Sequence, residues 1–217
     1  MVGQMKVTRG LATLVVGAVL ITGGCSTNRE VTRPDPVPID QELLTSALLT
    51  ADDVPSPYVL DEAAAPLGPE ILPEHECDDA LASLEPDEAA SVTFTADGLG
   101  TTLTNTVSYF PGQGGSAGNA YANLLASCKQ AVVEDEALRF TTVPLDFGVL
   151  SDNTRPLRVV VEHNDGTIEE RNLIVMQSGD LVSTIRLDGP RPTDLEVLDA
   201  VTRVAIGNLG EIAQAST

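Results

Sequence analysis

The order of hydrophobic and polar residues divides the chain into three stretches. Residues 11–21 form a continuous apolar run, residues 26–40 are polar and rich in proline, and the rest alternates between helical and strand-like periods. Only the third stretch has enough apolar residues to bury a core. We therefore expect one folded domain, residues 40–217, behind an N-terminal leader.

Helical periodicity marks four parts of the folded region, namely residues 40–54, 76–86, 116–133 and 193–215. Asp40 stands where a residue that caps the first helix is needed. The last stretch opens with Thr193 three residues before Glu196, which is the spacing of a capping box. Its apolar residues fall along one predicted stripe: Leu195, Leu198, Val201, Ala205, Leu209 and Ile212. Four helices of modest length are therefore predicted.

The first half of the folded region also predicts a hairpin. Residues 88–96 and 101–110 alternate Thr, Val and aromatic residues with a period of two. They flank Asp97-Gly98, a dipeptide that favours a tight turn. A further short strand is expected at Tyr58–Leu60.

The second half is richer in strands. Residues 138–147 and 156–187 are apolar or alternating, and two turn signals, Asn164-Asp165-Gly166 and Ser178-Gly179-Asp180, divide the longer run. These signals predict a meander of two hairpins. Strands joined by hairpins build an antiparallel sheet, so the expected fold class is α+β, with helices covering one face of the sheet.

The first 24 residues have the pattern of a lipoprotein signal peptide. Lys6 and Arg9 precede the apolar run, whose eleven residues fall short of the about 20 needed to span a bilayer. The run ends in Thr22-Gly23-Gly24-Cys25, which resembles the lipobox of bacterial lipoproteins, although an aliphatic residue is preferred at the position of Thr22. In such proteins the chain is cleaved before the cysteine, here Cys25, which is then acylated.

This interpretation predicts where the protein lives. Residues 1–24 would be removed, residues 25–39 would form a disordered linker, and acyl chains on Cys25 would hold the domain at the extracytoplasmic face of the cell membrane. The alternative is an ordinary secretory signal cleaved near Gly24, with Cys25 unmodified.

Acylation of Cys25 would leave two cysteines, Cys77 and Cys128. An even pair in an exported domain predicts a disulfide, because the compartment is oxidising. Closing a loop of about 50 residues would stabilise the fold by about 4 kcal/mol. With only His75 and His163 beside them, the two cysteines make a poor zinc site, so no metal is expected.

The charge of the chain excludes one class of partner. There are 32 acidic and 12 basic residues, a net charge of −20, and cleavage of the leader would remove two basic residues and leave −22. Such a surface repels nucleic acid, and no basic cluster reverses the sign locally. The acidic residues are expected to keep a tethered domain soluble.

The sequence offers one pattern with catalytic potential. Gly114-Gly115-Ser116-Ala117-Gly118 matches G-x-S-x-G, and Asp146 or Asp152 and then His163 follow in the order of a hydrolase triad. The loop is loose, however, and the sheet is built of hairpins rather than βαβ units. We expect the glycines to form a loop and Ser116 to cap a helix, so no catalytic residue, no cofactor and no enzymatic activity are predicted.

The layout as a whole resembles a known family. The segments "LLTADDVP", "RNLIVMQSGDLVSTIRLDG" and "DLEVLDAVTRVAIGNL", with a cysteine in each of two helices, are similar to actinobacterial extracytoplasmic sensor-like domains related to the extracellular domain of the kinase PknH. Stand-alone lipoproteins of this type exist. The chain departs from the kinase-attached members in having one cysteine pair rather than two and no tryptophan. The resemblance implies an α+β domain with a cleft for a small extracellular ligand.

Two functions follow as hypotheses. The first is a non-enzymatic ligand-binding or sensor-like lipoprotein that receives a small molecule, a lipid or an envelope component. The second is a structural lipoprotein of the cell envelope that docks to a protein partner. An enclosed pocket would favour the first, and an exposed apolar patch the second.

Overall fold

The computed structural model describes residues 38–64, 85–127, 130–133, 138–148, 151 and 153–216. All of them belong to one compact unit, Pro36–Thr217. Cys25, Cys77 and Cys128 lie outside the described residues, as does the helix expected at 76–86, so the lipid anchor and the disulfide remain predictions.

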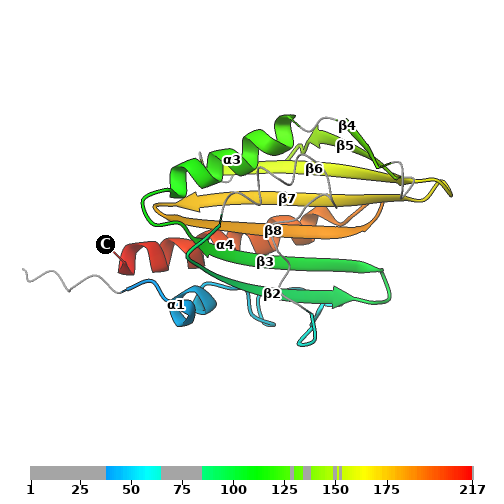
Figure 1. The fold of residues 1–217 in the computed structure, drawn as a ribbon. Coiled ribbons are helices and arrows are strands. Elements are labelled where there is room, and N and C mark those ends of the chain that lie inside the picture. Colours follow the sequence, from blue (N-terminus) through cyan, green and yellow to red (C-terminus); the bar gives the residue numbers. More distant parts are fainter. Residues whose placement is uncertain are drawn as a thin grey trace, which may run out of the picture. The chain divides into compact units, whose positions relative to one another are not determined.

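The described elements are shown in Figure 1 and run in the order α1 (Gln41–Ser46), β1 (Val59–Leu60), β2 (Glu88–Ala96), β3 (Thr101–Tyr109), α3 (Gly114–Ser127), β4 (Gln130–Val133), β5 (Leu138–Pro144), β6 (Thr154–His163), β7 (Ile168–Ser178), β8 (Leu181–Pro190) and α4 (Leu195–Ala215).

The eight strands form one antiparallel sheet in the order β1-β2-β3-β8-β7-β6-β5-β4. The three predicted hairpins are confirmed at β2–β3, β6–β7 and β7–β8. Gly166 and Gly179 take positive φ values of 86° and 60° in the last two turns, a conformation that favours glycine. The α+β class is thus confirmed. The insertion of β8 between β3 and β7 joins both halves of the chain in one sheet.

One face of the sheet carries the main hydrophobic core. Leu103 of β3, Ile185 of β8 and Ile174 of β7 share this face and are completely buried. α1 and α4 cover them, and α4 contacts both β7 and β8. The predicted apolar stripe of α4 is confirmed, since its buried residues include Leu198, Val201, Ala205, Leu209 and Ile212.

A helix also covers the other face. The side chain of Gln177 in β7 lies against α3, because a Cβ added to Gly118 would approach its Cβ to 3.4 Å. Successive residues of a strand point to opposite faces, so Gln177 and Met176, which belongs to the α4 core, lie on opposite sides. Figure 1 shows α3 lying over β6 and β7. The helices therefore lie on both faces of the sheet, whereas the sequence pattern predicted them on one.

The apolar residues of β5, β6 and β7 explain why α3 covers the second face of the sheet. Phe140, Val159, Leu173 and Val175 point toward the α3 side and are buried there, outside the α4 core. Without α3, part of this apolar surface would face water. The hydrophobic effect therefore favours packing one helix on this side.

Three element boundaries differ from the expectation. α1 ends at Ser46, well before Pro55, and the last part of the predicted 116–133 helix is instead strand β4. The cap of α4 is Asp194 rather than Thr193, since Asp194 Oδ1 accepts from the backbone N–H groups of Glu196 and Val197 at 2.9 and 3.4 Å. Thr193 is occupied by a different set of partners, described below.

Candidate functional site

A hollow of about 220 Å³ opens between α3 and the sheet, at the end where β6 begins and β7 ends. Its described lining comes from three elements and one loop: Gly118 and Asn119 of α3, Asn153 before β6, Arg155 of β6, and Val175 and Gln177 of β7. Small-molecule sites in proteins are concave. The hollow is therefore the candidate ligand site, in the position between sheet and helix that the cleft hypothesis required.

The walls of the hollow are fixed before any ligand arrives. The backbone N–H of Gln177 donates to the carbonyl oxygen of Asn153 at 3.3 Å, which ties β7 to the start of β6. Gln177 Nε2 donates to the carbonyl oxygen of Gly179 at 3.1 Å. This bond turns the amide oxygen of Gln177 toward Gly118, where an added Cβ would lie 3.5 Å from it.

Glycines let α3 approach the sheet closely. A Cβ at Gly114 would collide with the carbonyl oxygen of Gly179 and with the backbone of Asp180, so only glycine fits there. The same turn is held from its other side, because Asp180 Oδ2 accepts from the backbone N–H of Gly112 at 2.8 Å. The glycines of the G-x-S-x-G match thus position the helix wall of the hollow. The expectation that they form a loop and that Ser116 caps the helix was wrong, because the helix begins at Gly114 and Ser116 lies inside its first turn.

The charge of the hollow differs from that of the chain. None of the described residues that line it is acidic, although the chain has 32 acidic residues. Arg155 is the one cation among them, and its Nη1 donates to the carbonyl oxygen of Thr154 at 3.1 Å. Asn119, Asn153 and Gln177 add three amide groups. The described lining is thus rich in hydrogen-bonding groups and includes one basic side chain.

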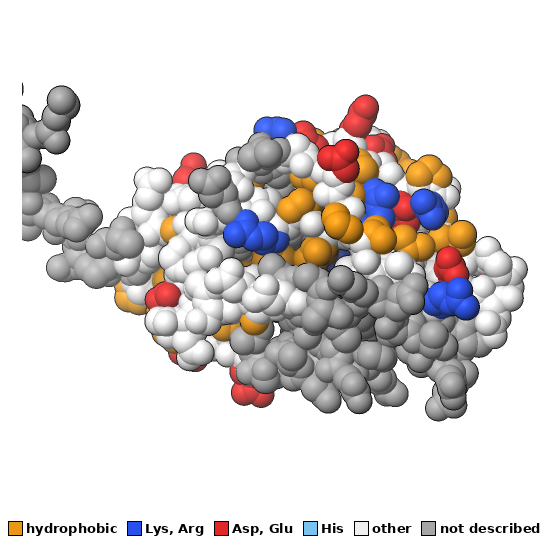
Figure 2. All heavy atoms as spheres, turned by 90° about the horizontal axis from the view of Figure 1, so that it is seen from above, with side chains coloured by type: hydrophobic (Ala, Val, Ile, Leu, Met, Phe, Trp, Pro, Cys, Tyr) orange, Lys and Arg blue, Asp and Glu red, His pale blue; other side chains and the backbone are white. Residues whose placement is uncertain are grey.

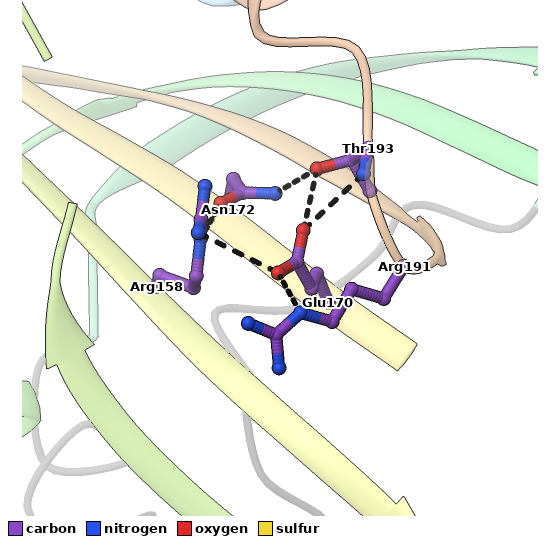
Figure 3. Close-up of polar contacts among 5 residues, drawn as sticks. All are labelled: Arg158, Glu170, Asn172, Arg191 and Thr193. Carbon is purple, nitrogen blue, oxygen red and sulfur yellow. Dashed lines mark hydrogen bonds and ion pairs between the residues drawn. The ribbon is translucent and has the colours of Figure 1, made fainter. Parts of the chain in front are cut away.

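A second polar cluster lies on the α4 face, where β8 leads into α4 (Figure 3). The carboxylate of Glu170, only 2% exposed, pairs with Arg191 Nε at 3.2 Å and with Arg158 Nη1 at 3.5 Å. Its other oxygen, Oε2, accepts from the backbone N–H and the hydroxyl of Thr193 at 3.2 and 3.1 Å. Asn172 completes the cluster, since it accepts from Arg158 Nε at 2.8 Å and donates to Thr193 Oγ1.

This cluster has a structural role. A buried carboxylate is costly unless charges and hydrogen bonds compensate it, and both oxygens of Glu170 are satisfied by protein groups. The bonds to Thr193 hold the residue that immediately precedes the cap of α4. The cluster therefore fixes the start of α4 against β7.

The hydrolase pattern is not assembled. α3 begins against the turn at Gly179, at the end of β7, so Ser116 lies near this end of the sheet. His163 lies at the other end of β7, where its backbone N–H bonds Thr167 and its Nε2 lies 3.5 Å from Glu169. Eleven residues of strand separate the two places, roughly 30 Å. Asp146 is an exposed loop residue, and Asp152 lies outside the described residues.

Most residues of the hollow were not predicted from the sequence, although strand alternation contained a signal. Arg155 falls on the same parity as Leu157 and Val159, so this exposed charged residue shares a mostly apolar strand face. Glu170 and Asn172 likewise share the parity of Ile174 and Met176, and all four are buried. Polar or charged residues on an otherwise apolar strand face were the available indicator of both places.

The described part of the chain contains neither a candidate metal site nor a helix that could span a membrane. No three His, Cys, Asp or Glu side chains in it are grouped so that they could hold a metal ion. Among the same residues, no helix is long and apolar enough to cross a membrane.

Comparison with known proteins gave one informative match. No protein-family model and no curated protein matches the sequence. Among solved structures, the extracellular domain of PknH from Mycobacterium tuberculosis matches with a TM-score of 0.55 and 14% identity, over 82% of this chain and 98% of that domain. A structure from Bacteroides thetaiotaomicron matches with a TM-score of 0.34 and 11% identity, over 55% of this chain and 39% of the other. This similarity is too low to indicate a common fold. The chain therefore has a fold like that of the PknH extracellular domain, as its layout predicted.

Proposed function

We propose that this protein is a non-enzymatic, extracytoplasmic sensor-like domain, anchored by lipid at Cys25, that binds a small molecule in the hollow beside α3. The observation that carries the proposal is the hollow itself, with walls fixed by backbone bonds and a lining unlike the acidic surface. The shared fold supports it, because the matching protein is the extracellular domain of PknH. The signal-like leader and the cysteine at its end support the location and the anchor.

Ligand binding is tested by native mass spectrometry of the full chain purified from its host. A bound small molecule should appear as an added mass that disappears on denaturation. Gly118→Leu, which places a side chain in the hollow, should remove it, while Arg203→Gln, an exposed change on α4, should not. A ligand equally retained by Gly118→Leu would place the site elsewhere.

The anchor needs a separate test. The wild-type chain should be found in the membrane fraction, and mass spectrometry of its first mature peptide should show acyl groups on Cys25. Cys25→Ser should release the protein from membranes or block its processing. An unmodified Cys25 in a secreted protein would support the ordinary signal peptide instead.

A protein-docking lipoprotein is the second candidate, and one surface favours it. On the α4 side of β5 and β6, beyond the strands that α4 contacts, Val143, Pro156 and Val160 are only partly buried. Figure 2 shows hydrophobic side chains gathered in a band across the surface seen from above, with basic and acidic groups beside it. Partly exposed apolar surface of this kind occurs at protein interfaces.

Cross-linking in the host distinguishes the two candidates. A docking function predicts that Val160→Glu abolishes a specific cross-linked partner while ligand binding in the hollow is unchanged. A sensor without this interface predicts the same cross-linking pattern for wild type and variant.

A further inference from the structure

Strand β1 forms one edge of the sheet and exposes both of its side chains. Val59 is 61% exposed and Leu60 is 44% exposed. A third exposed apolar residue, Leu99, lies in the turn that follows the β2 residues paired with β1. Exposed apolar side chains that gather in one region mark interaction sites. The edge at Val59 and Leu60, called the β1 edge below, is therefore a candidate docking surface.

The backbone of β1 is also open on its outer side. The N–H of Asp61 donates to the carbonyl oxygen of Thr93 at 2.9 Å, so these two residues form a hydrogen-bonded pair of the antiparallel ladder. Such pairs alternate along a ladder, so the N–H and C=O of Leu60, opposite Phe94, point away from β2. No residue in the described part of the chain bonds these two groups. The β1 edge can therefore bond one more strand.

The charge around the β1 edge has one sign. The sequence from residue 34 to residue 128 contains no lysine or arginine, and α1, β1, β2 and β3 all lie within it. Asp61 and Glu62 directly follow β1, and Asp97 opens the turn between β2 and β3. The arginines that the structure describes all lie from residue 139 onward. This edge therefore attracts a cationic partner and repels an anionic one.

Protection of the edge does not explain its apolar residues. Short edge strands flanked by proline and charged residues keep other chains away from a sheet, and Pro57 and Asp61 stand on either side of β1. That role needs polar side chains at the exposed positions, whereas this chain has Val59 and Leu60 there. Apolar positions with acidic flanks instead select one kind of strand and reject others.

We propose that the β1 edge binds an extended segment of a partner protein in which lysine or arginine flanks apolar residues. The segment pairs with the backbone of Leu60 as an added strand, and its apolar side chains pack beside Val59 and Leu60. Its cations face Asp61 and Glu62. Main-chain hydrogen bonds supply affinity in such strand addition, and the side chains supply specificity. This interaction does not involve the hollow beside α3, so it adds a partner protein to the function proposed above.

Fluorescence anisotropy with the purified full chain tests the class of partner. The probe is the labelled peptide Lys-Lys-Val-Ile-Val-Lys-Lys. Three comparison peptides have glutamate in place of lysine, serine in place of the apolar residues, or N-methyl groups on the central residues of the probe. The probe should bind at least tenfold more tightly than each of them, because they lack the cations, the apolar side chains or the backbone donors.

The comparison peptides also define the contrary outcomes. Equal affinity for the serine peptide would reduce the interaction to charge attraction, and equal affinity for the methylated peptide would exclude strand addition. Either result, or no binding of the probe, would overturn the proposal.

Variants connect the binding to the β1 edge. The double change Val59→Ser with Leu60→Ser removes exposed side chains only and should weaken the probe at least tenfold. The matched control is Ile168→Ser, which removes an exposed apolar side chain at the start of β7 and should have no effect. Unchanged affinity in the double variant would overturn the proposal.

A second double variant tests the charge and does not depend on the folding of the first. Asp61→Asn with Glu62→Gln should weaken the probe about tenfold at low salt and less at high salt, because salt screens exposed charges. Glu211→Gln, an exposed change on α4, should leave the affinity unchanged. Equal affinity in wild type and the double variant at low salt would contradict the role of the acidic flanks.

Analytical ultracentrifugation of the full chain distinguishes a partner protein from a second copy of this chain. Wild type and the variant Val59→Ser with Leu60→Ser should sediment alike. A dimer of the wild type that this variant loses would show that the edge pairs with its own copy, and the proposed partner would then be wrong.

Discussion

The two halves of the sheet are built in opposite ways. In the half formed by β2, β3 and β8, the apolar side chains face α1 and α4, and the other side carries hydroxyl and charged groups such as Thr104 and Arg186. In the half formed by β5, β6 and β7, Phe140, Val159 and Leu173 face the α3 side instead.

The strand between them belongs to both cores. Residues 172–176 of β7 are buried without interruption, because the even-numbered side chains face α4 and the odd-numbered ones face the α3 side. Each half is therefore covered mainly on one face, although α3 also contacts β8 and α4 also contacts β7. The Glu170 cluster lies on the α4 side of β6 and β7, and the hollow lies beside α3 on the other side of the sheet. Because the two helices cover different parts of the sheet, polar groups find room next to the strands.

The largest expected effect concerns the core under α4. Leu198→Ala removes a completely buried side chain from the centre of the α4 stripe and should lower the free energy of unfolding by about 4 kcal/mol. The control, Leu99→Ala, makes the same change at a turn residue that is half exposed and should cost at most about 0.5 kcal/mol. Urea unfolding followed by circular dichroism measures both. Similar losses would mean that the main core does not lie under α4.

The second effect tests the buried Glu170 cluster in the other half of the sheet. Glu170→Gln removes the charge that two arginines share and should cost about 3 kcal/mol. Glu162→Gln makes the identical change on the adjacent strand, where the carboxylate is exposed and 3.8 Å from Arg139, and should cost less than about 1 kcal/mol. A loss of stability in Glu170→Gln no greater than that in Glu162→Gln would contradict the structural role of the cluster.

The third effect tests how tightly α3 is packed. Burial raises the pKa of Tyr121, on α3, to about 12. The unfolded chain releases this proton near pH 10, so stability falls as the pH rises from about 10 to 12, by about 2 to 3 kcal/mol. Tyr121→Phe lacks this proton, so its free energy of unfolding relative to wild type should rise by that amount over the interval. Parallel curves for both proteins would indicate that α3 is not closed over the sheet.

The smallest effects have opposite signs at two helical glycines. Gly114→Ala should destabilise the fold by about 2 kcal/mol, because the new methyl group collides with the turn at Gly179. Gly207→Ala, in α4 with no atom near the added Cβ, should stabilise it by about 0.5 to 1 kcal/mol through helix propensity. Thermal unfolding measures both, and a stable Gly114→Ala would show that α3 can stand further from β7 than described.

The predictable parts of the fold were those with local causes. The hairpins at Asp97-Gly98, Asn164-Asp165-Gly166 and Ser178-Gly179-Asp180 were predicted because turn residues and alternation lie next to one another in the sequence. The stripe of α4 was predicted for the same reason. The capping box at Thr193 failed, since Asp194 competes for the same role and Thr193 is bound by Glu170 from a distant strand.

The candidate site shows the limit of the sequence in another way. Gly118, Arg155 and Gln177 come from three separate elements, and no spacing along the chain relates them. The parity of Arg155 and Glu170 places each charge on a strand face that also holds buried apolar residues, but it does not say which helix covers that face. Ser116 and His163, which the order along the chain placed in one hypothetical triad, lie at opposite ends of β7.

The sequence by itself determined the kind of elements present, the α+β class and the acidity of the surface, because periodicity, turn chemistry and charge are local or additive properties. Only the tertiary structure decided that β8 enters between β3 and β7, that α3 covers the second face, and that Gly118, Arg155 and Gln177 line one hollow. These features depend on which apolar surfaces pack against one another. The free energy gained by that packing comes here from contacts between residues far apart in the chain.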